Sequence, residues 1–304
     1  MDGVVPTSPE SLKHLFRELD FRPRKSLGQS FLTRESIARR LVASLGSLER
    51  STVLEIGGGF GILTALLAQQ TTRLIVYELD PVLFDFLKRT FPHLTTSLGT
   101  ALSVVEGHPS IRWVRGDICK SPFSEWVSPP DKLKVIGNLP YASSSAILLH
   151  LMGQRGSIGE AVLTLQREVA ERCLATPGSK SYSPLTCAIQ YGAEVEKLFL
   201  IPPNAFYPRP EVTSCAIRLT FSSAPRVSVS NEEFFFKVIR TAFGKRRKQL
   251  INSLGGLGVS KPALLSALKA SGIAPSRRAE ELSLEAFAML TGDVSYAMLS
   301  RKGK

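Results

Sequence analysis

The architecture of this chain follows from one stretch, Leu133-Lys134-Val135-Ile136-Gly137-Asn138-Leu139-Pro140-Tyr141. An apolar, extended-prone run that ends in Asn and Pro predicts a buried strand followed by a sharp turn. Pro140 fixes its own φ and pushes Leu139 toward an extended conformation. In an open α/β sheet, ligands bind at the carboxyl ends of the strands. The stretch therefore predicts an α/β fold whose binding site includes this turn.

The predicted turn carries two neutral acceptors and an aromatic ring. It can aim the Leu139 carbonyl and the Asn138 amide oxygen at one point, with the Tyr141 ring beside them. Such a site suits a planar ring with an exocyclic amino group, whose lone pair is delocalised and poorly nucleophilic. Acceptors that hold both amino hydrogens favour a pyramidal nitrogen and direct its lone pair at an electrophile. An ordinary Asn-Pro turn capped by a core tyrosine is the alternative, so other segments must decide.

A second strand, predicted at residues 51–56, runs into the turn Gly57-Gly58-Gly59-Phe60-Gly61. Glycines let the backbone pass through positive φ and approach a ligand closely. The following strand ends at Glu78, where an acid can bind ribose hydroxyls. Ile62 departs from the dinucleotide-binding spacing. Glu55, two residues before the first glycine, makes the segment more similar to an S-adenosylmethionine-binding turn.

Asp117 follows the strand predicted at residues 111–114 and can accept a hydrogen bond from an adenine amino group. Taken alone, it is as readily a helix N-cap. Successive strand-to-helix loops place Glu78, Asp117 and Asn138 at one edge of the sheet, which favours a shared crevice. Residues 92–110 are predicted to be an insertion, to which the sequence assigns no function.

The composition describes a globular protein with a strongly basic surface. The chain has 304 residues, of which 43% are hydrophobic and 21% charged, and its net charge is +12. Such a charge predicts a polyanionic partner, with a merely soluble basic surface as the alternative. We expect no membrane segment, because no apolar run is long enough, and a cytoplasmic location, because no signal pattern is present. The scattered Cys and His residues predict no metal site.

Two basic segments are candidate contacts to nucleic-acid phosphates. The first precedes Gly28 and contains Arg22, Arg24 and Lys25; a solvated loop is the alternative. The second is the densest basic cluster of the chain, for which a solvated helix face is the alternative. Its five cations, with no acid among them, are Arg240, Lys245, Arg246, Arg247 and Lys248.

The motifs, taken together and in order, resemble those of the small-subunit ribosomal RNA adenine N6,N6-dimethyltransferases (the KsgA type). They extend from about residue 22 to about residue 290. The matching segments are 25–32, 55–61, 78–80, 116–117, 138–141, 165–169, 206–214 and 246–254.

The resemblance implies a Rossmann-like, S-adenosylmethionine-dependent methyltransferase domain at residues 1–222, which includes the N-terminal helical and basic segment. It also implies a small all-helical RNA-binding domain at residues 223–304. The implied activity is dimethylation of N6 on two adjacent adenosines in a hairpin near the 3′ end of 16S rRNA. The implied partner is small-subunit rRNA within an assembling 30S particle during ribosome biogenesis, and we expect a monomer.

The resemblance also assigns roles to residues. Asn138 and the Leu139 carbonyl would hold the target N6, and Tyr141 and Phe206 would stack on the target base. From the residues alone, Phe206 is instead predicted to be a core side chain. Ser30 stands where the family usually has Asn or His, and Ala142 where Asn is common. The methyl donor would contact Gln29, Ser30, Leu32, Gly57, Glu78, Asp117 and Asn138.

Three other functions remain to be distinguished. A 23S rRNA adenine N6-methyltransferase of the macrolide-resistance type shares the N-terminal motifs, but residues 206–214 and 246–254 argue against it. A DNA adenine methyltransferase is less favoured, because those enzymes usually carry an acid or Asn followed by Pro-Pro-Tyr. A non-catalytic RNA-binding assembly factor on the same scaffold would be free to lose Glu78, Asp117 or Asn138, and all three are present.

Overall fold

The computed structural model describes residues 5–24, 28–91, 110–245 and 248–299. It divides into two compact units. The first comprises the chain up to Ala170 together with Glu194–Ser223, and the second comprises Glu171–Ala193 and the chain from Ala224 onward. The second unit thus takes residues 171–193 in addition to the segment predicted from position 223.

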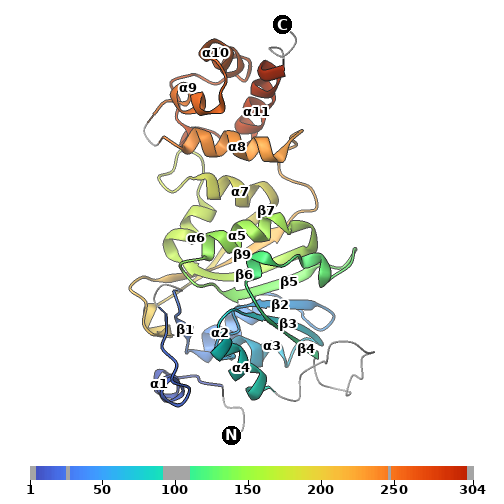
Figure 1. Ribbon diagram of the computed structural model, residues 1–304, viewed down its shortest axis with the longest axis vertical. Coiled ribbons are helices and arrows are strands. Elements are labelled where there is room, and N and C mark those ends of the chain that lie inside the picture. Colours follow the sequence, from blue (N-terminus) through green and yellow to red (C-terminus); the bar gives the residue numbers. More distant parts are fainter. Residues whose placement is uncertain (1–4, 25–27, 92–109, 246–247, 300–304) are drawn as a thin grey trace. The chain divides into compact units, whose positions relative to one another are not determined.

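A seven-stranded sheet forms the centre of the first unit, in the order β4-β3-β2-β5-β6-β9-β7 (Figure 1). The pairs from β4 to β6 are parallel, whereas β9 is antiparallel to β6. The strands are β2 (Thr52–Ile56), β3 (Arg73–Glu78), β4 (Ser110–Arg115), β5 (Leu133–Asn138), β6 (Ile158–Gln166), β7 (Ala193–Ile201) and β9 (Ser214–Phe221). This is the predicted α/β architecture, with the predicted strands at β2 to β5.

Helices follow the parallel strands because each strand must be connected to a parallel neighbour by a crossover. They are α3 (Ile62–Leu67), α4 (Pro81–Thr90) and α5 (Ser144–Gly153), and α2 (Glu35–Ala43) precedes β2. Leucines of α2 and α3 pack with Val53, Leu74 and Ile136 of the sheet into one buried cluster. The carboxyl ends of β2, β3 and β5 are thereby fixed to a rigid core.

A short two-stranded sheet lies beside the large one. Its strands β1 (Phe31–Leu32) and β8 (Phe206–Tyr207) are antiparallel, with Leu32 opposite Phe206. The N-terminal helix α1 (Pro9–Glu18) is capped by Ser8 and contributes Phe16 to an aromatic cluster. The Phe16 ring lies 5.5 Å from the Tyr207 ring, measured between centroids. These contacts join α1 to β8, and Phe16 also contacts Phe31 of β1.

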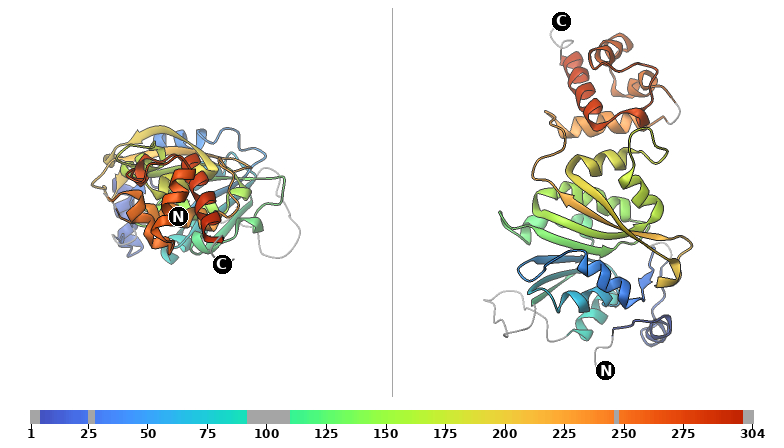
Figure 2. Two further views of the ribbon diagram at one scale, coloured as in Figure 1. Left: turned by 90° about the horizontal axis from the view of Figure 1, so that it is seen from above. Right: turned by 180° about the vertical axis from the view of Figure 1, so that it is seen from behind.

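Helices make up the second unit. They are α7 (Pro184–Gly192), α8 (Glu232–Phe243), α9 (Leu250–Ser253), α10 (Lys261–Ala270) and α11 (Leu284–Leu299), while α6 (Arg167–Leu174) crosses the boundary between the units. Figure 2 shows α8, α10 and α11 grouped together, around a core that includes Phe235, Leu268 and Phe287. Asn231 caps α8, accepting a hydrogen bond from the Phe234 amide at 2.8 Å. None of the described helices is long and apolar enough to cross a membrane.

Candidate active site

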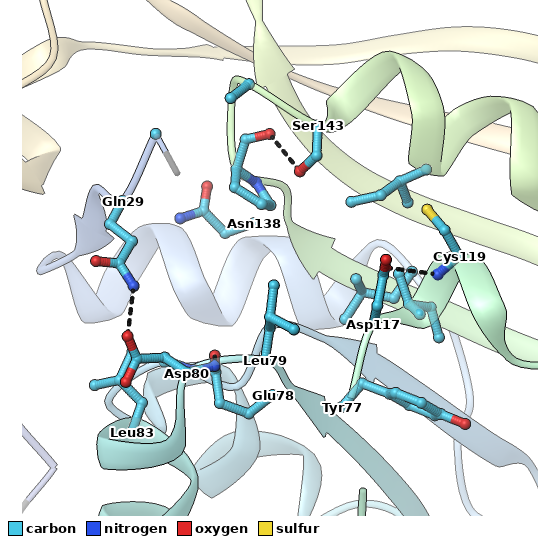
Figure 3. Close-up of a pocket in the computed structure, with 18 of the residues that line it drawn as sticks. Gln29, Tyr77, Glu78, Leu79, Asp80, Leu83, Asp117, Cys119, Asn138 and Ser143 are labelled. Atoms are coloured by element: carbon cyan, nitrogen blue, oxygen red, sulfur yellow. Dashed lines mark hydrogen bonds between the residues drawn. The ribbon is translucent and has the colours of Figure 1, made fainter. Parts of the chain in front are cut away.

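A cavity of about 430 Å³ opens at the carboxyl ends of β2, β3, β4 and β5 (Figure 3). This volume falls in the range of small-molecule sites. The cavity is lined by glycine backbone, a few polar side chains and apolar walls. Its polar lining comes mainly from Gln29, Ser30, Glu78, Asp80, Asp117, Asn138 and Ser143. The structure therefore brings together the residues that the sequence places in separate loops.

The glycine-rich turn presents bare backbone to this cavity. Gly57 and Gly59 have φ values of +77° and +56°, which side-chain-bearing residues rarely adopt. The Gly59 amide donates to Glu78 Oε2 at 2.9 Å, and the Asp80 amide donates to Glu78 Oε1, also at 2.9 Å. The Glu78 carboxyl is thus held rigidly at the cavity wall, with lone pairs left on both oxygens. Burial raises its pKa above the ordinary range, and the two backbone donors oppose that rise.

Asp117 both caps a helical turn and lines the cavity. Its Oδ1 accepts a hydrogen bond from the Cys119 amide at 3.0 Å. The two interpretations of this residue are therefore compatible, because a carboxylate has two oxygens that can each accept more than one hydrogen bond. Leu79 directly follows Glu78, and Ile118 directly follows Asp117. Both form apolar walls of the same cavity. Leu79 is 54% exposed.

The side chain of Asn138 has a defined orientation. Its Nδ2 donates to the Ser30 carbonyl at 3.0 Å. A carbonyl can only accept, so this bond fixes which end of the amide is which. Among the described residues, Oδ1 has no hydrogen-bond partner, and Figure 3 shows the Asn138 amide within the crevice. The site thus holds an acceptor of the kind that the sequence predicts.

Gln29 and Ser30 reach the cavity from the loop before β1. Gln29 Nε2 donates to Asp80 Oδ2 at 3.3 Å, and its Oε1 accepts from the Arg24 amide at 2.8 Å. The Ser30 hydroxyl donates to the Pro208 carbonyl at 2.8 Å. Both side chains are therefore held in place by protein partners at the cavity rim.

Behind the glycine turn lies a buried acid. Glu55 is 1% exposed; its Oε2 accepts from the Thr64 hydroxyl at 2.7 Å. Its Oε1 has no partner among the described residues. Burial raises the pKa of this carboxyl to about 8, so its neutral form prevails at pH 7.

The remaining part of the turn is tied to the sheet. The Leu139 amide donates to the Thr164 carbonyl at 3.1 Å, and the Leu139 side chain is buried. The Tyr141 hydroxyl is hydrogen-bonded to the Ser214 hydroxyl at 2.7 Å. Leu139 and Tyr141 are not themselves among the residues that line the cavity, whereas Pro140 and Ala142, on either side of Tyr141, are; the stacking role of Tyr141 stays a prediction. The aim of the Leu139 carbonyl stays a prediction.

Leu32 and Phe206 do not lie where the sequence predicts. Their side chains are 5% and 2% exposed, and neither lines the cavity. The reason is the pairing of β1 with β8, which places the two residues opposite each other and turns both side chains into the core of the sheet. The core interpretation of Phe206 is therefore the one that fits this structure, and its predicted stacking on a base does not.

Of the basic residues predicted to contact RNA, those in the described ranges are exposed. Arg22 and Arg24 lie in the first unit, close in sequence to Gln29. Arg240 lies in the last turn of α8, and Lys245 and Lys248 follow this helix in the second unit. Lys25, Arg246 and Arg247, like positions 92–109 of the predicted insertion, lie outside the described residues.

Sequence reasoning missed the apolar walls Leu79 and Ile118 and the polar contribution of Asp80. A signal was available, because each wall residue directly follows an acid at a strand end. Within the described ranges, no group of three or more His, Cys, Asp or Glu side chains is arranged to hold a metal ion.

Comparison with known proteins adds a family to this geometry. A model of the ribosomal RNA adenine dimethylase family matches residues 20–292. The ribosomal RNA small subunit methyltransferase A of Moorella thermoacetica is 38% identical over 299 residues, covering 96% of this chain and 98% of that protein. A protein of the same name from Acidobacterium capsulatum is 40% identical over 267 residues, covering 88% of this chain and 89% of the relative.

Two solved structures share the fold. A dimethyladenosine transferase from Plasmodium falciparum has a TM-score of 0.69 and 24% identity, covering 88% of this chain and 98% of that protein. The 23S rRNA methyltransferase ErmE has a TM-score of 0.61 and 23% identity, covering 87% of this chain and 99% of that protein. At such identities the likeness concerns the fold.

Proposed function

This chain belongs to the ribosomal RNA adenine dimethylase family, and we propose that its cavity binds S-adenosylmethionine next to an rRNA adenosine presented to Asn138. The protein is an rRNA adenine methyltransferase, and its activity is N6 dimethylation of small-subunit rRNA. The observation that carries the residue assignment is the fixed amide of Asn138, whose Oδ1 faces the cavity that also contains Glu78 and Asp117.

The cavity fits the methyl donor by its chemistry. The Glu78 carboxyl can accept from two adjacent ribose hydroxyls, and the Asp117 carboxylate can accept from an adenine amino group. Leu79 and Ile118 offer apolar faces to a planar base. The backbone of Gly57 and Gly59 leaves room for close approach. Gln29 and Ser30 stand at the rim, and we propose that the Gln29 side chain contacts the donor there.

When bound, S-adenosylmethionine supplies an electrophilic methyl group on a sulfonium. The chain's own groups prepare the nucleophile. Asn138 Oδ1 and the Leu139 carbonyl accept from the two N6 hydrogens, which favours a pyramidal nitrogen with its lone pair aimed at the methyl group. The dipoles of these acceptors are neutral and preorganised, which suits a reaction between a cation and a neutral amine. Tyr141 stacks on the target base, which must be unpaired or flipped.

Room for a second transfer comes from small residues. Ala142, Ser143 and Ala146 line the cavity beside Asn138. After the first transfer, N6 still carries one hydrogen and a lone pair. Because no bulky side chain stands at position 142, we propose that the site accommodates the monomethylated amine and completes N6,N6-dimethylation of two adjacent adenosines in the hairpin. The proposed substrate is rRNA within an assembling 30S particle, met by a monomer.

The test is transfer of labelled methyl groups from S-adenosylmethionine to small subunits that lack this modification, followed by nucleoside analysis. We expect N6,N6-dimethyladenosine at two adjacent positions. Large subunits serve as the control substrate, and label in their rRNA alone would instead support the macrolide-resistance type of activity. Failure of the purified protein to bind S-adenosylmethionine in a calorimeter would contradict the proposal and favour a non-catalytic factor.

A further inference from the structure

Two serines contact the Asn138–Tyr141 turn from opposite ends. At one end, the Tyr141 hydroxyl and the Ser214 hydroxyl are 2.7 Å apart. Ser214 is fully buried and is the first residue of β9, where it pairs in register with Gln166 of β6. The sheet therefore fixes the Ser214 hydroxyl, and through it the direction of the Tyr141 ring.

At the other end, Ser30 acts through its backbone. Its carbonyl accepts from Asn138 Nδ2 at 3.0 Å, and its hydroxyl donates to the Pro208 carbonyl at 2.8 Å. The hydrogen bond to Pro208 holds Ser30 in place. The hydrogen bond from Asn138 to the Ser30 carbonyl fixes the orientation of the Asn138 amide in the cavity. With its hydrogen used in this way, the Ser30 hydroxyl is not free to donate to a methyl donor.

Both contacts lead to the same segment of chain. Pro208 and Ser214 lie at the two ends of the connection between β8 and β9. Gly28 also lies against the turn, because a Cβ built there would lie 2.8 Å from the Tyr141 amide nitrogen. The turn is therefore enclosed by residues 28–30 and 208–214, both of which belong to the first unit.

From this arrangement we infer that Ser30 and Ser214 are positioning residues for methyl transfer: Ser214 orients the Tyr141 ring, and Ser30 orients the Asn138 amide. The inference rests on the proposed function, since it concerns how the same turn presents the target base. Neither serine touches the base itself. Their contribution is to exclude alternative orientations of the Asn138 and Tyr141 side chains, which must act together on the target base. Catalysis by positioning depends on fixed orientations of this kind.

Ser214 can be tested by a double-mutant cycle on the full chain, with small subunits as substrate. Tyr141→Phe and Ser214→Ala each remove one hydroxyl of the pair without removing the ring. We expect each to lower kcat by roughly three- to tenfold, as the loss of one hydrogen bond does, and the double variant to lose no more than either single one. Affinity for S-adenosylmethionine should stay within about twofold of wild type.

Thr164→Val provides the matched control. The Thr164 hydroxyl is buried next to the same turn, but it has no hydrogen-bond partner among the described residues. We expect its removal to leave kcat unchanged. Ser30→Ala tests the other end: it frees Ser30 from Pro208, so kcat should fall while affinity for the donor is retained.

Several results would overturn the inference. If the kcat of the double variant falls by the product of the two single-variant losses, the effects of Tyr141→Phe and Ser214→Ala are independent. Ser214 would then support the fold rather than orient the Tyr141 ring. Wild-type kcat in Tyr141→Phe would do the same, and this nearly isosteric variant decides the matter if Ser214→Ala fails to fold. Wild-type protein that transfers no methyl group would instead overturn the proposed function, which the unmutated control in the same assay reveals.

Discussion

At the scale of single residues, the proposed function depends on neutral acceptors, and Asn138 is the one whose orientation a hydrogen bond defines. We expect Asn138→Ala to lower kcat about 100- to 1000-fold, the range typical for loss of one preorganised polar group at a reacting centre. RNA affinity should change little, because no cation is removed. Single-turnover methyl transfer at saturating RNA measures this. Asn204→Ala, an exposed asparagine before β8, is the matched control and should react at the wild-type rate.

Glu55 makes a prediction about pH at the same scale. Burial raises its folded-state pKa to about 8 from an ordinary value of 4.5. Between these values the folded state binds a proton that the unfolded state does not, so stability falls as pH rises, by at most about 1.4 kcal/mol per pH unit. Glu55→Gln keeps an acceptor for Thr64 but cannot ionise. Urea unfolding from pH 5 to 8 should therefore show a steeper decline for wild type than for the variant; parallel curves would contradict the assignment.

At the scale of elements, the loop before β1 must pass close to the turn after β5, and only glycine fits at position 28. Gly28 has φ +63°, and a Cβ there would also lie 3.0 Å from the Ala142 amide nitrogen. We expect Gly28→Ala to destabilise the protein by several kcal/mol and to reduce methyl transfer. Gly46 has the same φ of +63° but nothing within 4 Å of its Cβ position. Gly46→Ala should cost only about 1 kcal/mol of backbone strain and leave activity intact, so comparison by urea unfolding isolates the contact.

The same scale shows which features the sequence can predict. Strands that end at the cavity, such as β5 before Asn138, can be predicted because an apolar run is followed by polar residues and a turn. The pairing of β1 with β8 was missed, since two-residue strands far apart in sequence leave no periodic signal. That pairing is why Leu32 and Phe206 are buried. The membership of residues 171–193 in the second unit was missed for a similar reason: it depends on packing with the helices after Ala224.

At the scale of the whole molecule, the question is whether the net charge of +12 acts diffusely or through a defined surface. Exposed Arg240 lies in the last turn of α8, and exposed Lys245 and Lys248 follow that helix. Exposed Lys261 and Lys269 lie on α10 of the same unit. We expect replacement of the first three by Gln to weaken rRNA binding. The slope of log K against log salt should become shallower by about 2 to 3, since each phosphate contact contributes about 0.7 to 0.9. Replacement of Lys261 and Lys269 by Gln should leave the slope nearly unchanged.

If both sets flatten the slope in proportion to the charge removed, attraction by the net charge would account for binding and the assignment to the end of α8 would be wrong. Because the donor cavity lies in the first unit, neither set should alter S-adenosylmethionine affinity, which calorimetry on the same samples measures.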